Sequence, residues 1–161
     1  MKRYLFLDID GVLNGHEWNE TSESNTIDYK NVLNLNLVIE KTKCKIILHS
    51  AWRYMIHGKD MTIRGFEYLL RTHGVTSNLY IDGITESDKK ISKREVQIEE
   101  YLRYLREEFW FKEDFKYAIV DDLPLFFTES EIQDNFVRTD GKFGMSLFDA
   151  EKLIEILGCK I

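Results

Sequence analysis

An apolar run near the start of the chain stops abruptly at two aspartates and a glycine. Residues 4–7 predict a buried strand, and Asp8, Asp10 and Gly11 follow it at once. Two carboxylates at positions i and i+2 can face one crevice once the chain leaves the pleat, and the glycine permits a tight exit. Ionised aspartates are costly to bury unless a positive group meets them, so a cation is the expected partner.

Strands and helices are predicted to alternate along the chain. Apolar segments predict strands at residues 4–8, 45–49, 79–81, 117–121 and 135–139. Apolar residues at helical spacing predict helices over residues 26–40, 62–73, 92–109 and 146–157, and Ser92 with Glu95 and Ser146 with Asp149 mark the last two starts. This alternation indicates a mostly parallel sheet with helices on both faces. We expect an α/β fold, a Rossmann-like three-layer sandwich.

The length of 161 residues fits one domain, residues 1–161, with a core that needs no disulfide. The interval from Asn14 to the second strand holds one helix and a loop, which leaves no room for a full cap domain. The polar loop at residues 15–25 directly follows the aspartate pair. We expect it to be mobile and to lie over the site as a lid.

The formal net charge of −6 argues against non-specific attraction to nucleic acid or to anionic membranes. No apolar stretch is long enough to span a bilayer, so no membrane association is expected. Cys44 and Cys159 have no metal-ligand spacing and are expected to be free thiols in a reducing compartment. These features favour a cytoplasmic protein, and nothing in them indicates an obligate protein partner.

Three of the predicted strands end in residues that can support chemistry. The first is followed by Asp8 and Asp10, the second by Ser50, and the fourth ends in Asp121 and Asp122. Parallel strands bring these ends to one edge of the sheet, where ligands bind in open α/β folds. Hard oxygen ligands that leave room for water suit Mg²⁺, which also bridges to phosphate. The sequence therefore predicts a magnesium and phosphate site.

The expected phosphate contacts are the hydroxyl of Ser50 and the basic pair Lys93 and Arg94. Each has a plainer interpretation, because serine often caps a helix and a basic pair is usually solvated. Arg94 is favoured over Lys93, since a guanidinium can grip phosphate with two donors, but either can serve. Trp52 can shape the site or belong to the core. His49 is expected beside the site without binding the cation.

These motifs, in this order, resemble those of the haloacid dehalogenase-like (HAD) superfamily. The matching residues are Asp8, Asp10 and Gly11 for its first motif, Ser50 for the second, Arg94 or Lys93 for the third, and Asp121 with Asp122 for the fourth. The likeness is greatest to the small HAD domains associated with nucleic-acid (RNA) repair proteins, and it runs through the whole length. Where those domains read SSSWR, this chain reads HSAWR, so His49 replaces a family serine.

The resemblance implies a mechanism and a cofactor. Asp8 would attack phosphorus to give an aspartyl-phosphate, and Asp10 would protonate the leaving oxygen and then activate water. Mg²⁺ would be held by Asp8, the backbone carbonyl of Asp10, and Asp121, with Asp122 as a ligand or as an orienting group. The expected substrate is a phosphorylated small molecule such as a nucleotide, or a nucleic-acid end. The sequence leaves these two open.

Two other functions remain compatible with the residues. A receiver-type signalling domain also clusters aspartates, Mg²⁺, a hydroxyl and a lysine around one phosphoaspartate, but it has nothing that corresponds to Asp10. A catalytically idle HAD-like module would keep the fold and bind a partner. Repeated turnover of a phosphomonoester distinguishes a phosphatase from both.

Overall fold

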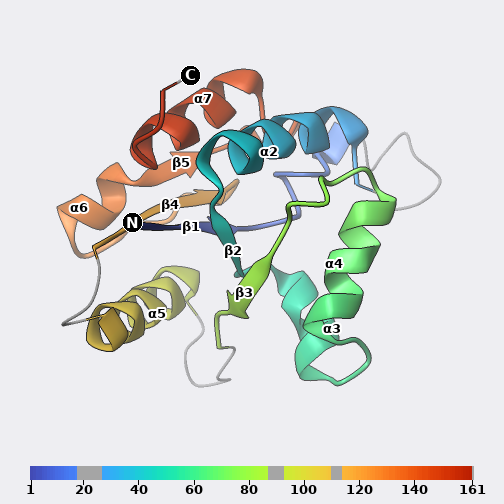
Figure 1. Ribbon diagram of the computed structural model, residues 1–161. Coiled ribbons are helices and arrows are strands. Elements are labelled where there is room, and N and C mark those ends of the chain that lie inside the picture. Colours follow the sequence, from blue (N-terminus) through green and yellow to red (C-terminus); the bar gives the residue numbers. More distant parts are fainter. Residues whose placement is uncertain (18–26, 87–92, 110–113, 161) are drawn as a thin grey trace.

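The computed structural model describes residues 1–17, 27–86, 93–109 and 114–160. At its centre is a parallel five-stranded sheet with the order β3-β2-β1-β4-β5 (Figure 1). The strands are β1 (Lys2–Leu7), β2 (Lys45–Leu48), β3 (Ile81–Ile84), β4 (Phe115–Asp121) and β5 (Phe136–Arg138). This arrangement confirms the predicted α/β, Rossmann-like sandwich.

Helices cover both faces of the sheet (Figure 1). They are α2 (Tyr29–Thr42), α3 (Tyr54–His57), α4 (Ile63–Thr72), α5 (Arg94–Phe109), α6 (Ser130–Asp134) and α7 (Leu147–Ile156), with a 3₁₀ turn η1 (Ala51–Arg53) before α3. Successive strand residues point to opposite faces. Leu5 and Leu7 therefore pack in one core with α2, α4 and α7, whereas Tyr4 and Phe6 pack in a second core with α5 and α6. The sheet is buried on both sides.

Local signals explain where the long helices begin. The predicted capping box at α7 is present, because the Ser146 hydroxyl accepts from Asp149 N and the Asp149 carboxylate accepts from Ser146 N. At α2 the Asp28 carboxylate accepts from Lys30 N at 2.9 Å. Helix α5 begins at Arg94, and Ser92 of its predicted capping box lies outside the described residues.

The edge strand β3 differs most from its prediction. It forms over Ile81–Ile84, and not over residues 79–81, which share only Ile81 with it. Its sequence, IDGI, contains two residues that are rare in strands, so propensity does not mark it. Tertiary contacts fix it instead: the Glu67 carboxylate accepts from Ile81 N at 2.6 Å, and Asp82 pairs with Lys45 on β2. The short α3 and α6 were not predicted.

The strand order brings β1 and β4 together at the point where the chain changes direction across the sheet. From β1 the chain builds outward through β2 and β3, and it then returns to place β4 on the other side of β1. Ligands in open α/β sheets bind at such a point, beyond the carboxyl ends of the strands. Between β1 and β2 the described residues include the helix α2, which packs against α7.

A loop from the C-terminal part of the chain braces the loop that follows β1. The Thr139 hydroxyl donates to the carbonyl of Gly11 at 2.8 Å, and Met145 N donates to the carbonyl of Val12 at 2.8 Å. His16 N donates to the carbonyl of Gly141 at 2.9 Å. These bonds hold the start of the predicted lid, of which residues 18–25 lie outside the described residues.

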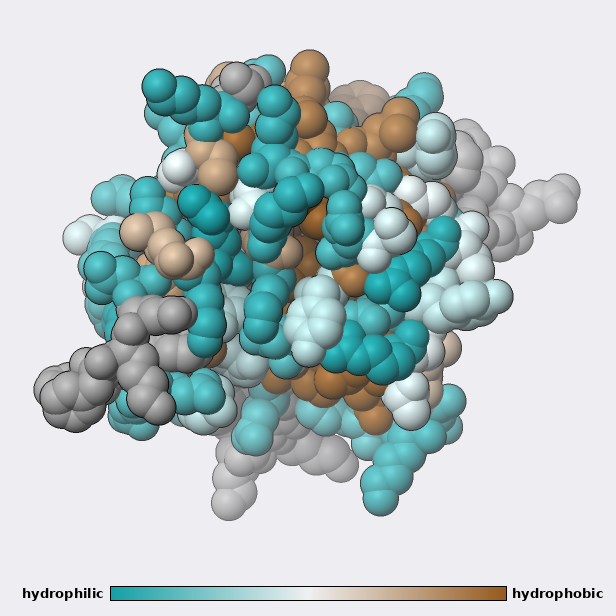
Figure 2. Space-filling view, in the orientation of Figure 1, coloured by the Kyte–Doolittle hydropathy of each residue, from teal (hydrophilic) through white to brown (hydrophobic). Residues whose placement is uncertain are grey.

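The visible surface in Figure 2 is mostly hydrophilic, and its apolar atoms form small separated groups. Among the described helices, none has the length and apolar character needed to cross a membrane. Cys44 and Cys159 are both free, as expected.

Candidate active site

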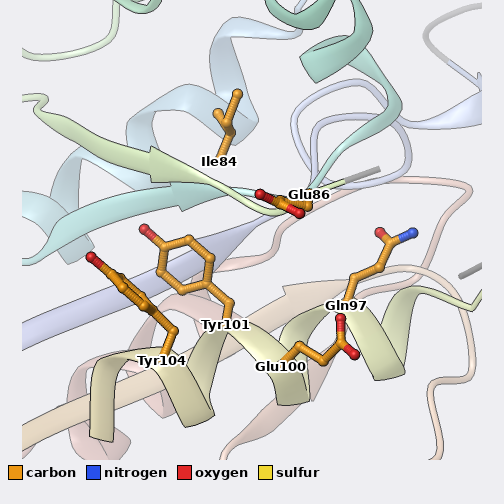
Figure 3. Close-up of a pocket in the computed structure, with 6 residues that line it drawn as sticks. All are labelled: Ile84, Glu86, Gln97, Glu100, Tyr101 and Tyr104. Atoms are coloured by element: carbon orange, nitrogen blue, oxygen red, sulfur yellow. The ribbon is translucent and has the colours of Figure 1, made fainter. Parts of the chain in front are cut away.

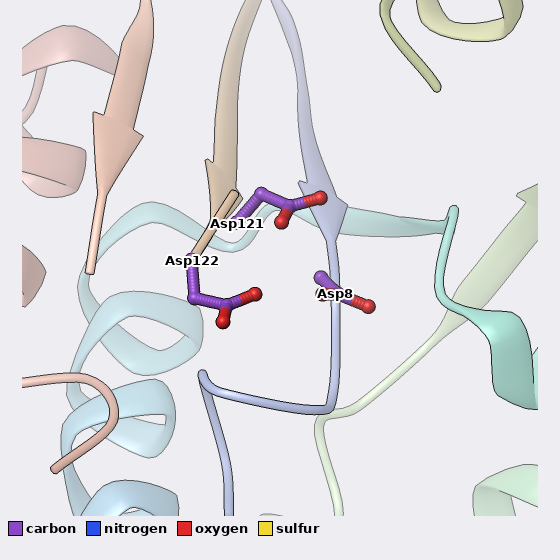
Figure 4. A group of neighbouring side chains, drawn as sticks. All are labelled: Asp8, Asp121 and Asp122. Carbon is purple, nitrogen blue, oxygen red and sulfur yellow. The ribbon is translucent and has the colours of Figure 1, made fainter. Parts of the chain in front are cut away.

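Three carboxylates meet at the ends of β1 and β4. Asp8 follows β1, Asp121 is the last residue of β4, and Asp122 comes next. One oxygen atom from each lies within 4.8 Å of the others, and Figure 4 shows Asp121 and Asp122 pointing from β4 toward the end of β1. The strands are in register here, since Leu7 pairs with Val120. Adjacent parallel strands thus bring together residues that are more than a hundred positions apart in sequence.

Two glycines leave the space that the Asp122 carboxylate occupies. Gly11 has a φ of +74°, and a Cβ there would lie 2.3 Å from Cγ of Asp122. A Cβ on Gly141 would lie 2.6 Å from Oδ2 of the same side chain. Gly11 is therefore required twice, by its backbone conformation and by the close approach of a carboxylate.

A single guanidinium contacts two of the three carboxylates. Arg94 Nη1 donates to Asp8 Oδ2 at 2.8 Å and to Asp121 Oδ2 at 2.7 Å. Partial burial by itself would lower the pKa of Arg94, but the charges of Asp8 and Asp121 outweigh it and raise that pKa above its ordinary value. Lys93 is exposed at the residue before α5. Of the predicted basic pair, Arg94 is the residue that reaches the aspartates.

His49 adds a second contact to Asp121. The imidazole is fully buried, and its Nε2 lies 3.0 Å from Asp121 Oδ2. An ionised carboxylate only accepts hydrogen bonds, so Nε2 carries the proton. The other oxygen, Oδ1, accepts from Leu123 N at 2.8 Å. Asp121 is therefore fully hydrogen-bonded at both of its oxygens.

The three carboxyl groups differ in their pKa values. Burial tends to raise the pKa of Asp121, but the hydrogen bond and charge of His49, together with Arg94, lower it to about 2. Burial raises the pKa of Asp8, and the nearby Asp121 adds to the rise, although His49 and Arg94 oppose it. Burial and the charges of Asp121 and Asp8 also raise the pKa of Asp122. Asp121 is held ionised, whereas the charges of Asp8 and Asp122 are compensated only in part.

This imbalance fits a divalent cation. Three carboxylates face one guanidinium, and Asp8 Oδ1 is buried with no hydrogen-bond partner in the described structure. A buried carboxylate oxygen without a partner is costly, and a metal ion would remove that cost. The three side chains offer carboxylate oxygens. Mg²⁺ prefers such oxygen ligands, whereas softer metal ions prefer nitrogen or sulfur. Asp8, Asp121 and Asp122 are thus able to hold the predicted ion.

The Asp10 carboxylate lies outside this cluster and has its own partners. The indole Nε1 of Trp52 donates to both of its oxygens at 3.0 and 3.1 Å, and Asn14 Nδ2 donates to Oδ1 at 3.0 Å. The Trp52 ring also packs edge-on against Phe66 in the core, with the ring centroids 6.2 Å apart. Trp52 therefore belongs both to the site and to the core, and it orients Asp10 from a fixed position.

Ser50 caps the 3₁₀ turn that follows β2, in agreement with the prediction that this serine could serve as a helix cap. Its hydroxyl accepts from Trp52 N at 3.3 Å, which leaves the hydroxyl proton for another acceptor. The turn is fastened by Arg53, which donates to the backbone carbonyls of His49 and Ser50 and to Gln97 Oε1 at 2.6 Å. Ser50 is thus held at the end of β2, beside the end of β1.

A family model described as the HAD domain in Swiss Army Knife RNA repair proteins matches residues 4–150. The chain belongs to this family. Comparison with curated proteins and with solved structures found no match. Membership supports a hydrolase of the phosphatase type, and it agrees with the resemblance found in the motifs.

The HAD domain also contains site residues that its motifs did not reveal. No partner of His49 was predicted, and Trp52 was assigned to either the core or the site. Asn14 and Gln97 were not predicted as site residues. Gln97 lies three residues after Arg94, on the same face of α5, and this spacing is a signal that could have indicated it. The partner of His49 depends on how β1 separates β2 from β4, which no local pattern encodes.

Proposed function

We propose that this HAD domain, taken as one unit over residues 1–161, is a Mg²⁺-dependent phosphomonoester hydrolase that forms an aspartyl-phosphate on Asp8. The observation that carries the proposal is the state of Asp8. One of its oxygens is paired with Arg94, the other is buried without a partner, and two more carboxylates lie beside it. Such a carboxylate is placed to act on a ligand and contributes little to holding the fold.

In the first step an oxygen of Asp8 attacks phosphorus, and the bond from phosphorus to the leaving oxygen breaks. Asp10 gives that oxygen its proton, and Trp52 and Asn14 keep the Asp10 carboxyl in place for the transfer. In the second step Asp10 takes a proton from water, which attacks phosphorus. The bond to Asp8 breaks, and inorganic phosphate leaves.

The charge of the phosphoryl group needs positive partners. Arg94 is placed to share its guanidinium between Asp8 and a phosphoryl oxygen, and Ser50 can donate its hydroxyl proton to another. Mg²⁺, held by Asp8, the backbone carbonyl of Asp10, Asp121 and Asp122, would neutralise further charge. Asp121 is suited to act as a metal ligand in a fixed position, because His49 and Arg94 keep its carboxylate ionised and oriented.

The proposed substrate is a nucleotide or the terminal phosphate of a nucleic acid. The family's description as a domain of RNA repair proteins supports a nucleic-acid end. The described residues place no separate domain over the site, which suits a phosphate carried on a bulky molecule. The net charge of −6 favours a small substrate over a long polyanion.

A screen for phosphate release tests the proposal. The substrates are mononucleotides, 3′- and 5′-phosphorylated oligonucleotides and an aryl phosphate, each with Mg²⁺ and with chelator. Asp8→Asn is expected to lower the rate by at least about a thousandfold, because it removes the nucleophile without changing its size. Asp82→Asn, which changes a surface aspartate, is the matched control and should retain the rate.

The same screen separates the alternatives. A receiver-type domain would take up one phosphoryl group from a small phosphodonor and would not turn over a monoester repeatedly. An idle module would release no phosphate at all. Full activity of Asp8→Asn would contradict the mechanism.

A further inference from the structure

A cavity of about 320 Å³ lies between helix α5 and the end of β3 (Figure 3). Its lining consists of Ile84, Glu86, Gln97, Glu100, Tyr101 and Tyr104. The four residues from α5 have the spacing i, i+3, i+4 and i+7, so they share one face of the helix. In Figure 3 the side chains of Tyr101 and Tyr104 rise from α5 on the side of β3. The volume is at the lower end of the range for small-ligand sites, about 300–1,000 Å³.

The cavity begins one turn along α5 from Arg94, at Gln97. Gln97 lies one turn after Arg94, and it accepts a hydrogen bond from Arg53, which also donates to the carbonyl of Ser50. A rise of 1.5 Å per residue places Tyr101 about 10 Å and Tyr104 about 15 Å along the helix from Arg94. One nucleotide spans the shorter distance from its phosphate to the far edge of its base, and that edge then lies where the ring of Tyr104 adjoins the ring of Tyr101.

Two tyrosines form an aromatic wall in the cavity. The rings of Tyr101 and Tyr104 are 5.9 Å apart at 67°. Tyr101 is fixed, because its ring packs edge-on against Phe6 and its hydroxyl lies where a Cβ on Gly83 would be. Tyr104 is 54% exposed. The ring of Tyr101 is therefore held rigidly, and the exposed ring of Tyr104 is available for stacking with a planar group.

The charges that line the cavity are negative. Glu86 and Glu100 are both exposed, and the described residues of the lining include no lysine or arginine. Carboxylates accept hydrogen bonds from N–H groups and repel phosphate. The cavity therefore suits an uncharged planar group with N–H donors, and it does not suit the backbone of a polynucleotide.

We propose that this cavity binds the base of the nucleotide whose phosphate lies at Asp8. The base stacks on Tyr104 beside Tyr101, and its amino group donates to Glu86 or Glu100. Any further nucleotides leave the site in another direction, away from the two carboxylates. The inference rests on the proposed function and adds the part of the substrate that is recognised.

The test compares two dinucleotides with the same terminal phosphate, one with a terminal adenine and one with an abasic terminal sugar. The wild-type protein is expected to have a kcat/KM at least about tenfold higher for the adenine substrate, since stacking on an aromatic side chain is sequence-tolerant and strong. Tyr104→Ala is expected to reduce this ratio to near one. The matched control is Tyr68→Ala, which removes an exposed tyrosine on α4 and should keep the ratio.

Equal kcat/KM values for the two substrates in the wild-type protein would overturn the proposed cavity function while phosphate release itself still stood. If neither substrate released phosphate, the proposed hydrolase activity would be wrong. The affinities of the two dinucleotides would then test whether the cavity binds the base. Calorimetric titration would then have to give tighter binding of the adenine dinucleotide to the wild-type protein and loss of that difference in Tyr104→Ala. Equal affinities would overturn it.

Discussion

Asp8 and Glu67 are both buried carboxylates, at 1% and 3% exposure, but their surroundings differ. Glu67 on α4 accepts from the backbone N–H of Ile81 and pairs with Arg64 and Arg71. Asp8 shares one guanidinium with a second carboxylate and keeps one oxygen without a partner. The fully paired carboxylate joins α4 to β3, whereas the incompletely paired one is left for a ligand. Burial alone does not distinguish a structural carboxylate from a reactive one.

Arg94→Ala has the largest expected effect on this contrast. It removes the cation that Asp8 and Asp121 share, so kcat/KM for phosphate release should fall by about a hundredfold or more. Arg64→Ala is the matched control, because Arg64 contacts Glu67 and should leave kcat/KM unchanged. A loss in Lys93→Ala with none in Arg94→Ala would show that Lys93 holds the phosphate.

Glu67→Ala is expected to lower the free energy of unfolding by about 2 kcal/mol, because Ile81 N then has no acceptor and two arginines lose their partner. The arginines are partly exposed, and solvent limits the loss. Glu67→Gln keeps an acceptor oxygen and should lose less. Urea denaturation measures both variants, and equal losses would show that the Ile81 bond contributes nothing.

Magnesium should stabilise the folded protein by binding at the Asp8 cluster, and the surroundings of Glu67 should play no part in this effect. At ten times its dissociation constant, Mg²⁺ should raise the free energy of unfolding by about 1.4 kcal/mol, through binding to the folded state alone. Thermal denaturation with Mg²⁺ and with chelator measures this shift. Glu67→Gln should retain the shift and Asp121→Asn should lose it. An unchanged shift in Asp121→Asn would place the ion elsewhere.

The smallest effect concerns the stability of the metal-free protein. The pKa of Asp8 is raised on folding, so its carboxyl stabilises the fold while protonated and loses that contribution as the pH rises through the folded pKa. Asp8→Asn removes this loss and should raise the free energy of unfolding at pH 7 by more than at pH 4. Denaturation in chelator at both pH values measures the difference, and a gain that shrank toward pH 7 would contradict the sign.

The sequence predicted those parts of the fold that local patterns encode. Unbroken apolar runs identified β1, β2 and β4, since strands buried on both faces need apolar residues throughout. Capping signals located the start of α7. The edge strand β3 escaped because its pairing, and not its composition, makes it a strand.

The candidate site follows the same division. Asp8, Asp121 and Asp122 were predicted to meet because each follows an apolar run, and the structure brings them together. The pairing of His49 with Asp121 and of Trp52 with Asp10 depends on strand order and helix packing. The spacing of residues in the sequence does not reveal either of these. Glu67 was equally hidden, since a glutamate in an amphipathic helix normally faces solvent.

The brace between Thr139 and Gly11 has a consequence for how the protein is made. The chain leaves the ribosome from its N-terminus, so Asp8 emerges early, but the hydrogen bonds that hold its loop come from residues 139–145. The loop that carries Asp8 therefore cannot reach its final structure until nearly all of the described chain has been synthesised. A nascent polypeptide that ended before residue 139 would carry all four motifs and still lack these hydrogen bonds.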